Sequence, residues 1–206
     1  MNPGYLHRLV LLLLAGITTF VSAPAYADDP IQVLIETDAG SFVVEVYTDQ
    51  APVSSASFLA YVDAGLYTGA VFYRTVRKDN DRGSPIIEVI QGGLLDEDRA
   101  LKPVAHESTL FTGILHTDST ISLARAEPGT GGGAAFFICV GDQPGLDYGA
   151  SRNPDGLGFA AFGRVIEGMD IVRAIHKMDA SSPSDSEYTN GQMLTEPVRI
   201  DSARRL

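Results

Sequence analysis

The sequence predicts a mainly β protein whose strands close into an antiparallel barrel capped by two helices. Three observations indicate this fold: many short apolar segments recur at strand length, two segments carry the helical repeat, and strands and helices do not alternate. Regular strand–helix alternation is typical of a parallel sheet, whereas many short strands separated by turns are typical of sandwiches and barrels. The sequence contains no internal repeat and no low-complexity linker, so we expect one domain.

The first predicted strands form a hairpin. Residues 31–37 and 41–47 alternate apolar and polar side chains on either side of a short turn that contains Gly40. A helix is predicted to begin at Pro52 and to end near Gly65, because the apolar positions between them follow the helical repeat.

The remaining predicted elements are short strands and one further helix. A second helix is predicted over residues 168–178, with Ile171, Val172 and Ile175 on one face. The Ser- and Asp-rich stretch 180–191 is predicted to be a loop. Short apolar runs predict the remaining strands, over residues 70–76, 86–91, 121–124, 135–140, 160–165 and 197–202.

The first 27 residues have the layout of a secretory signal peptide. A weakly basic start precedes an apolar run over residues 9–20, and Ala25-Tyr26-Ala27 is a cleavage motif. The run is too short to span a bilayer, which disfavours an uncleaved anchor. We therefore expect cleavage near Asp28, a mature protein that is periplasmic or secreted, and no membrane contact after cleavage.

The charge and the cysteine content restrict the class of partner. The formal net charge is −11 at pH 7, so the chain repels nucleic acid and anionic membranes. We therefore expect a protein or peptide as its partner. Cys139, the one cysteine, cannot form an internal disulfide and is expected to be a buried thiol.

Two strand segments each carry one long polar side chain in apolar surroundings. Arg74 ends the run over residues 71–74, and Gln91 stands before Gly92-Gly93. A guanidinium and an amide beside aromatic and aliphatic side chains can hold an uncharged, partly apolar ligand, and no nucleophile accompanies them. Taken alone, Arg74 also fits an ordinary strand residue in a surface ion pair.

Five segments in order resemble the cyclophilin family of peptidyl-prolyl cis/trans isomerases, over about residues 31–176. They are Val71-Phe72-Tyr73-Arg74, Val89-Ile90-Gln91-Gly92-Gly93, Ile121-Ser122-Leu123-Ala124-Arg125, Ala135-Phe136-Phe137-Ile138 and the stretch 159–170. The resemblance implies a closed eight-stranded barrel with two capping helices over residues 28–206, acceleration of X-Pro isomerisation, and no metal or organic cofactor. It implies proline-containing peptides and unfolded exported proteins as partners, and we expect a monomer.

The resemblance also implies the roles of individual residues. Arg74 would be catalytic, stabilising the twisted amide of a bond whose rotation barrier is about 20 kcal/mol. Gln91 would bind the substrate backbone or orient Arg74. Because strand neighbours face opposite sides, one of Phe136 and Phe137 can face the pocket, and the resemblance selects Phe137 as its floor. The other implied substrate-binding residues are Phe72, Tyr73, Val89, Ala124, Arg125, Ala135, Leu146 and Phe159.

The chain departs from the family pattern at the rim of this site. Tyr73 stands where histidine is most frequent, Ala135 where glutamine is common, Arg125 where asparagine is common, and Phe159 where histidine is often found. These changes leave the arginine and the pocket in place. They also motivate a second hypothesis, a catalytically weak proline-peptide-binding chaperone module on the same fold.

Other classes of protein fit the sequence less well. A small-molecule-binding barrel of the lipocalin kind predicts an empty interior, whereas the residues expected inside this barrel are large. Ser122 lies in no G-x-S-x-G elbow and has no His or Asp partner recognisable in the sequence, so a serine hydrolase is not expected. The histidines lack metal-ligand spacing, which argues against a zinc site.

Two loops are longer than the resemblance requires, residues 76–85 and 149–158. Either they flank the groove and tune substrate choice, or they are solvent-exposed decoration.

Overall fold

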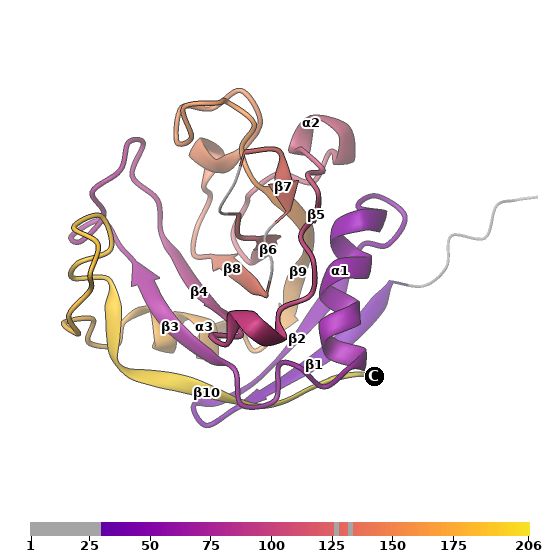
Figure 1. Ribbon diagram of the computed structural model, residues 1–206, viewed down its shortest axis with the longest axis horizontal. Helices are drawn as coiled ribbons and strands as arrows, with labels where there is room; N and C mark the ends of the chain where they lie inside the picture. The colour runs from indigo at the N-terminus through magenta and orange to yellow at the C-terminus, as the bar shows by residue number, and fades with distance from the viewer. Residues whose placement is uncertain (1–29, 126–127, 132–133) are drawn as a thin grey trace, which may run out of the picture.

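A computed structural model describes residues 30–125, 128–131 and 134–206, so the predicted signal peptide lies outside the described residues. Eight strands form a closed antiparallel barrel in the order β1-β10-β3-β4-β8-β6-β9-β2, as predicted (Figure 1). Their bounds are β1 Ile31–Thr37, β2 Gly40–Val46, β3 Val71–Val76, β4 Val89–Gly93, β6 Thr120–Leu123, β8 Ala135–Cys139, β9 Ala160–Glu167 and β10 Met193–Arg205.

Both predicted helices are present, as α1 Pro52–Asp63 and α3 Met169–His176. The short elements were not predicted, because two to four residues are too few to show a repeat of apolar positions. They are η1 Glu97–Arg99, β5 Val104–Ala105, α2 Thr109–Thr112, β7 Thr130–Gly131 and η2 Pro144–Leu146. β10 also begins earlier than predicted and β4 later. Within the described ranges, no helix has the length and apolar character needed to cross a membrane.

The two longer helices lie at opposite ends of the barrel. α3 packs on the turn between β1 and β2, where a Cβ on Gly40 would come 2.6 Å from Cδ1 of Ile171. α1 begins beyond the other end of β2, and Figure 1 shows it beside the start of β1. The first backbone N–H groups of α1 lack helical partners, and the Glu107 carboxylate accepts those of Val53 at 3.1 Å and Ser54 at 2.6 Å. A distant loop therefore supplies the anion that a helix N-terminus favours.

Large side chains fill the barrel interior. The ring centroids of Phe58 and Phe162 are 5.0 Å apart, and those of Phe72 and Phe136 are 5.7 Å apart in an edge-to-face arrangement. The largest fully buried side chains include Phe42, Phe58, Tyr61, Tyr67, Phe72, Phe136 and Phe162. The lipocalin-like hypothesis required an empty interior and is therefore wrong.

A second apolar cluster lies outside the barrel core, and we call it the outer cluster. Strand β8 supplies both sets of side chains, because Phe136 and Ile138 belong to the core whereas Phe137 and Cys139 belong to the outer cluster. Cys139 is fully buried, as predicted, and burial raises the pKa of its thiol well above the usual value. The buried members of the outer cluster are Val76, Ile87, Val89, Phe137, Cys139 and Leu146.

A β-bulge in β3 decides which way Arg74 faces. Phe72 pairs with Gly92 and Arg74 pairs with Gln91, so Tyr73 is an extra residue between two consecutive ladder positions. Phe72 and Arg74 therefore face opposite sides, although regular alternation would place them on the same side. Phe72 is fully buried in the core against Phe136, so the prediction that it binds substrate is wrong.

Candidate active site

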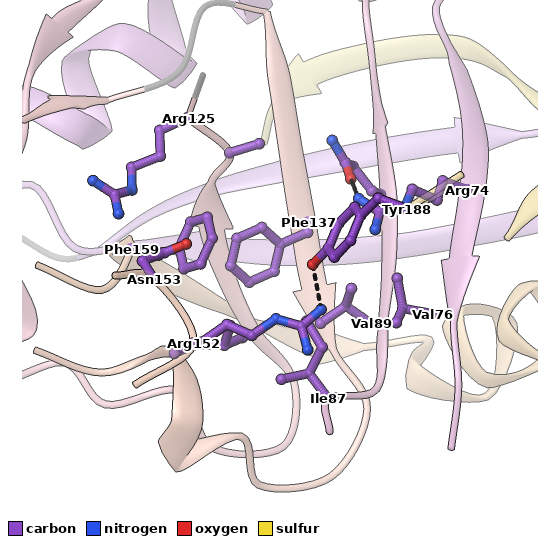
Figure 2. Close-up of a pocket in the computed structure, with 13 residues that line it drawn as sticks. Arg74, Val76, Ile87, Val89, Arg125, Phe137, Arg152, Asn153, Phe159 and Tyr188 are labelled. Carbon is purple, nitrogen blue, oxygen red and sulfur yellow. Dashed lines mark hydrogen bonds between the residues drawn. The ribbon is translucent and has the colours of Figure 1, made fainter. Parts of the chain in front are cut away.

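A pocket of about 210 Å³ opens over the outer cluster. Figure 2 shows the Phe137 ring at its centre, with Phe159 on one side and Tyr188 on the other. Phe137 and Phe159 meet edge to face, with centroids 5.2 Å apart. The pocket is lined by Arg74, Val76, Ile87, Val89, Gln91, Ala124, Arg125, Phe137, Leu146, Arg152, Asn153, Phe159 and Tyr188. It therefore offers an apolar slot with polar groups at its edge.

Two glutamines hold the Arg74 guanidinium at the edge of this slot. Nη1 of Arg74 donates to Oε1 of Gln91 at 2.9 Å, while Nε and Nη2 donate to Oε1 of Gln192 at 2.9 and 2.6 Å. No Asp or Glu among the described residues forms an ion pair with Arg74, so the surface ion-pair interpretation does not hold there. Burial lowers the pKa of Arg74, and the nearby Tyr188 and Tyr73 oppose that shift. An arginine remains protonated under such conditions, so the pocket carries a fixed positive charge.

Tyr73 and Ala135, which were predicted to bind substrate, are not among the residues that line the pocket. Tyr73, the extra residue of the bulge, accepts a hydrogen bond through its hydroxyl from Nε2 of Gln91 at 2.9 Å. It therefore supports Gln91, which in turn orients Arg74. Ala135 lies two residues before Phe137 and pairs with Gly93, and its single methyl group is absent from the pocket lining.

Gln192 is a site residue that the sequence interpretation missed. It is fully buried, and its Nε2 donates to the backbone oxygen of Asn80 at 2.9 Å, so the amide orientation is fixed. Its neighbour Met193 pairs with Arg74 across β10 and β3. The available signal was a lone glutamine between a glycine and the apolar pair Met193-Leu194, which parallels the setting of Gln91.

The other two arginines of the pocket are each neutralised by a carboxylate. Arg125 bonds Asp155 through both Nη atoms, at 2.7 and 2.8 Å, and its guanidinium lies 5.5 Å from the centroid of Phe159. These bonds lower the pKa of Asp155 to about 2. Arg152 forms the corresponding pair with Asp81, at 2.8 and 2.9 Å. Arg74 therefore differs from both in having no carboxylate partner among the described residues.

One long loop lines the pocket and the other supports it. The loop over residues 76–85 contributes Asp81, whose side chain is 0% exposed, and the loop over 149–158 contributes Arg152, whose side chain is 4% exposed. Asn153 and Arg152 line the pocket directly. The interpretation of these loops as solvent-exposed decoration is therefore wrong.

A buried polar chain lies behind the pocket floor. The His116 ring stacks on Phe137, with centroids 5.8 Å apart and planes at 17°. Its Nδ1 lies 2.8 Å from Oδ1 of Asp147 and its Nε2 lies 3.0 Å from Oγ of Ser122. Ser122 therefore has His and Asp partners that the sequence did not reveal. Because Ser122 is fully buried, its hydroxyl cannot attack a substrate, and the chain instead supports the ring of Phe137.

The His116 chain makes stability depend on pH. Burial lowers the pKa of His116 below its ordinary value, although Asp147 opposes the shift. In the unfolded chain the histidine binds a proton near pH 6.5, whereas the folded chain resists protonation. Stability is therefore fully present above that pH and is lost as the pH falls below it. His176 is shifted in the same direction, also mainly by burial.

We expect the free energy of unfolding, measured by urea denaturation, to fall between pH 7.5 and pH 5.5. A single histidine contributes at most about 1.4 kcal/mol per pH unit. The variant His116→Gln, which cannot bind the proton, should show a shallower decline than the wild type. Identical slopes for the two proteins would contradict a role for His116.

The chain is similar to known proteins over most of its length. The family model described as cyclophilin type peptidyl-prolyl cis-trans isomerase/CLD matches residues 32–205. A peptidyl-prolyl cis-trans isomerase of Streptomyces antibioticus is 33% identical, covering 84% of this chain and 96% of the relative. One of Acinetobacter baylyi is 30% identical, covering 96% of this chain and 95% of the relative.

Solved structures share the fold. A crystal structure of a cyclophilin type peptidyl-prolyl cis-trans isomerase of Cryptosporidium parvum has a TM-score of 0.63 at 19% identity, covering 86% of this chain and 98% of the other. A second structure of that protein, in the presence of the dipeptide Ala-Pro, has a TM-score of 0.61 at 19% identity, covering 84% and 97% of the two chains.

Proposed function

Because the chain belongs to the cyclophilin-type peptidyl-prolyl cis-trans isomerases, we propose that its pocket holds the proline of an X-Pro peptide and that Arg74 accelerates rotation about the bond before that proline. The observation that carries this proposal is the Arg74 guanidinium, fixed by two amide oxygens beside an apolar slot and without a carboxylate partner among the described residues. The Cryptosporidium parvum structure in the presence of Ala-Pro supports a proline peptide as the ligand.

The proposed mechanism is stabilisation of the twisted amide. In the planar amide the nitrogen lone pair is delocalised, which gives the bond its partial double-bond character. Rotation localises the pair on nitrogen, so the nitrogen becomes a hydrogen-bond acceptor in the twisted state alone. Arg74 uses three N–H groups of its guanidinium in hydrogen bonds to the glutamines, which leaves its other N–H donors available. A donor fixed in advance stabilises the twisted state more than the planar one and therefore lowers the barrier.

The test is the rate of cis-to-trans isomerisation of a short Ala-Pro peptide in the presence of residues 28–206, followed by NMR exchange. The uncatalysed reaction takes tens of seconds or more at 25 °C, so acceleration is easily observed. The second candidate, a binding module, is favoured by Ala135, which stands where glutamine is common in the family and offers no side-chain hydrogen bond to a substrate. Peptide binding by the folded protein without any acceleration would establish that candidate and exclude the enzyme.

We further propose that the protein is exported and acts on proteins that fold after export. The support is the signal-peptide layout of the first 27 residues. Amino-terminal sequencing of the protein recovered from an exporting bacterial host should begin near Asp28 in the periplasmic or extracellular fraction. Recovery of the uncleaved chain in the cytoplasm would exclude export.

A further inference from the structure

Tyr188 stands between two guanidinium groups at the edge of the pocket. Its ring centroid lies 5.6 Å from Cζ of Arg74 and 5.8 Å from Cζ of Arg152. Its hydroxyl accepts a hydrogen bond from Nη2 of Arg152 at 2.6 Å, which Figure 2 shows as a dashed line. Tyr188 belongs to the loop over residues 180–191, far in sequence from both arginines.

Arg152 is fixed by contacts with a third loop. Its two Nη atoms donate to both oxygens of Asp81, and Nη1 also donates to the backbone oxygen of Pro85 at 2.8 Å. The space beside it is filled, since a Cβ on Gly83 would lie 2.0 Å from Nη1 of Arg152. A guanidinium held by this many partners provides a rigid support for the Tyr188 hydroxyl.

The position of Tyr188 is not explained by packing in a core. The residue is 46% exposed, and it belongs to neither the barrel core nor the outer cluster. Its described contacts are those with Arg74 and Arg152 and with the pocket itself. The ring therefore acts on the pocket more than on the stability of the barrel.

A ring over the Arg74 guanidinium favours catalysis in two ways. It attracts the cation through its π electrons, and it keeps water away from one side of the group. The glutamines fix Arg74 through hydrogen bonds, whereas the Tyr188 ring attracts its cation from a third direction. A donor that is both restrained and shielded from water stabilises a transition state more effectively than a solvated one.

We propose that Tyr188 is a positioning residue for Arg74 and that the Asp81–Arg152 pair holds it in place. Three loops outside the barrel, over residues 76–85, 149–158 and 180–191, then jointly set the rate of isomerisation. This inference rests on the proposed isomerase function and adds a residue that acts on the reaction through Arg74.

The first experiment compares kcat and KM of the mature wild type with those of Tyr188→Ala and Tyr188→Phe. We expect Tyr188→Ala to lose roughly tenfold in kcat/KM, mainly in kcat, because the ring contact with the cation is removed. Tyr188→Phe keeps the ring and loses the bond to Arg152, so its loss should be smaller. The matched control is Tyr148→Ala, since Tyr148 is also 46% exposed but does not line the pocket, and its activity should equal that of the wild type.

The second experiment asks whether Tyr188 acts through Arg74. In an Arg74→Ala background, the change Tyr188→Ala should produce no further loss, because the group that it positions is absent. Losses that multiply would assign Tyr188 a separate contact with the substrate and overturn the proposal. Wild-type activity in Tyr188→Ala would also overturn it, whereas an inactive wild type would instead overturn the proposed function.

Discussion

Replacing Arg74 by alanine is expected to lower kcat/KM for an X-Pro peptide roughly a hundredfold, the usual effect of removing a fixed hydrogen-bond donor from a transition state. The loss should lie in kcat, because the apolar floor that we propose to bind the proline ring is untouched. NMR exchange at high enzyme concentration measures rates in both the wild type and the variant. Arg74→Lys should restore little of the lost kcat/KM, since one ammonium cannot bond both Gln91 and Gln192 and still face the substrate.

The control for this experiment is Arg173→Ala. Arg173 lies on α3 in an exposed ion pair with Asp118 and is not part of the pocket lining, so activity should not change. If Arg74→Ala kept a third or more of the wild-type rate, the acceleration would have to come from the apolar slot alone.

Replacing Asp81 by alanine is expected to lower the free energy of unfolding by about 3–5 kcal/mol. The reason is that Arg152, with 4% of its side chain exposed, would keep its charge in a buried position without its carboxylate partner. Urea denaturation measures the change as a lower midpoint with an unaltered slope. The double variant Asp81→Ala/Arg152→Ala should be less destabilised than Asp81→Ala, because no unpaired charge remains.

An exposed pair on the same chain provides the comparison. Asp63 and Arg205 form an ion pair in which the side chains are 50% and 41% exposed. Asp63→Ala should therefore cost about 0–1 kcal/mol. Equal losses for Asp63→Ala and Asp81→Ala would show that burial of the Asp81–Arg152 pair has no energetic consequence.

Most of the barrel followed from local patterns in the sequence. Strand alternation and helical periodicity depend on near neighbours, so they predicted the hairpin β1–β2, helices α1 and α3, and the opposite facing of Phe136 and Phe137. The bulge at Tyr73 interrupts that alternation without any mark in the sequence, so the sequence did not reveal that Phe72, which the resemblance implied as a substrate-binding residue, faces the core.

The site was predicted less completely than the fold. Arg74, Gln91, Val89, Ala124, Arg125, Phe137, Leu146 and Phe159 do lie together around one pocket. Three residues of the site were missed, namely Gln192, Arg152 and Tyr188. They come from loops or from a strand end, and contacts between such segments leave no periodic pattern in the sequence. The partners of Ser122 were missed for the same reason, since His116 lies 6 residues from Ser122 in the chain and Asp147, which contacts His116, lies 31 residues from that histidine.

The division of apolar side chains between the barrel core and the outer cluster affects how this protein can diverge. Side chains of the outer cluster, which include the pocket floor, and side chains that hold the barrel together occupy opposite faces of β8. A substitution at Phe137 or Leu146 costs its own packing energy but leaves the aromatic interior unaltered. New ligand preferences can therefore be acquired on the outer face while the interior continues to supply most of the folding free energy, so a directed-evolution library confined to the outer face should retain a high proportion of folded members.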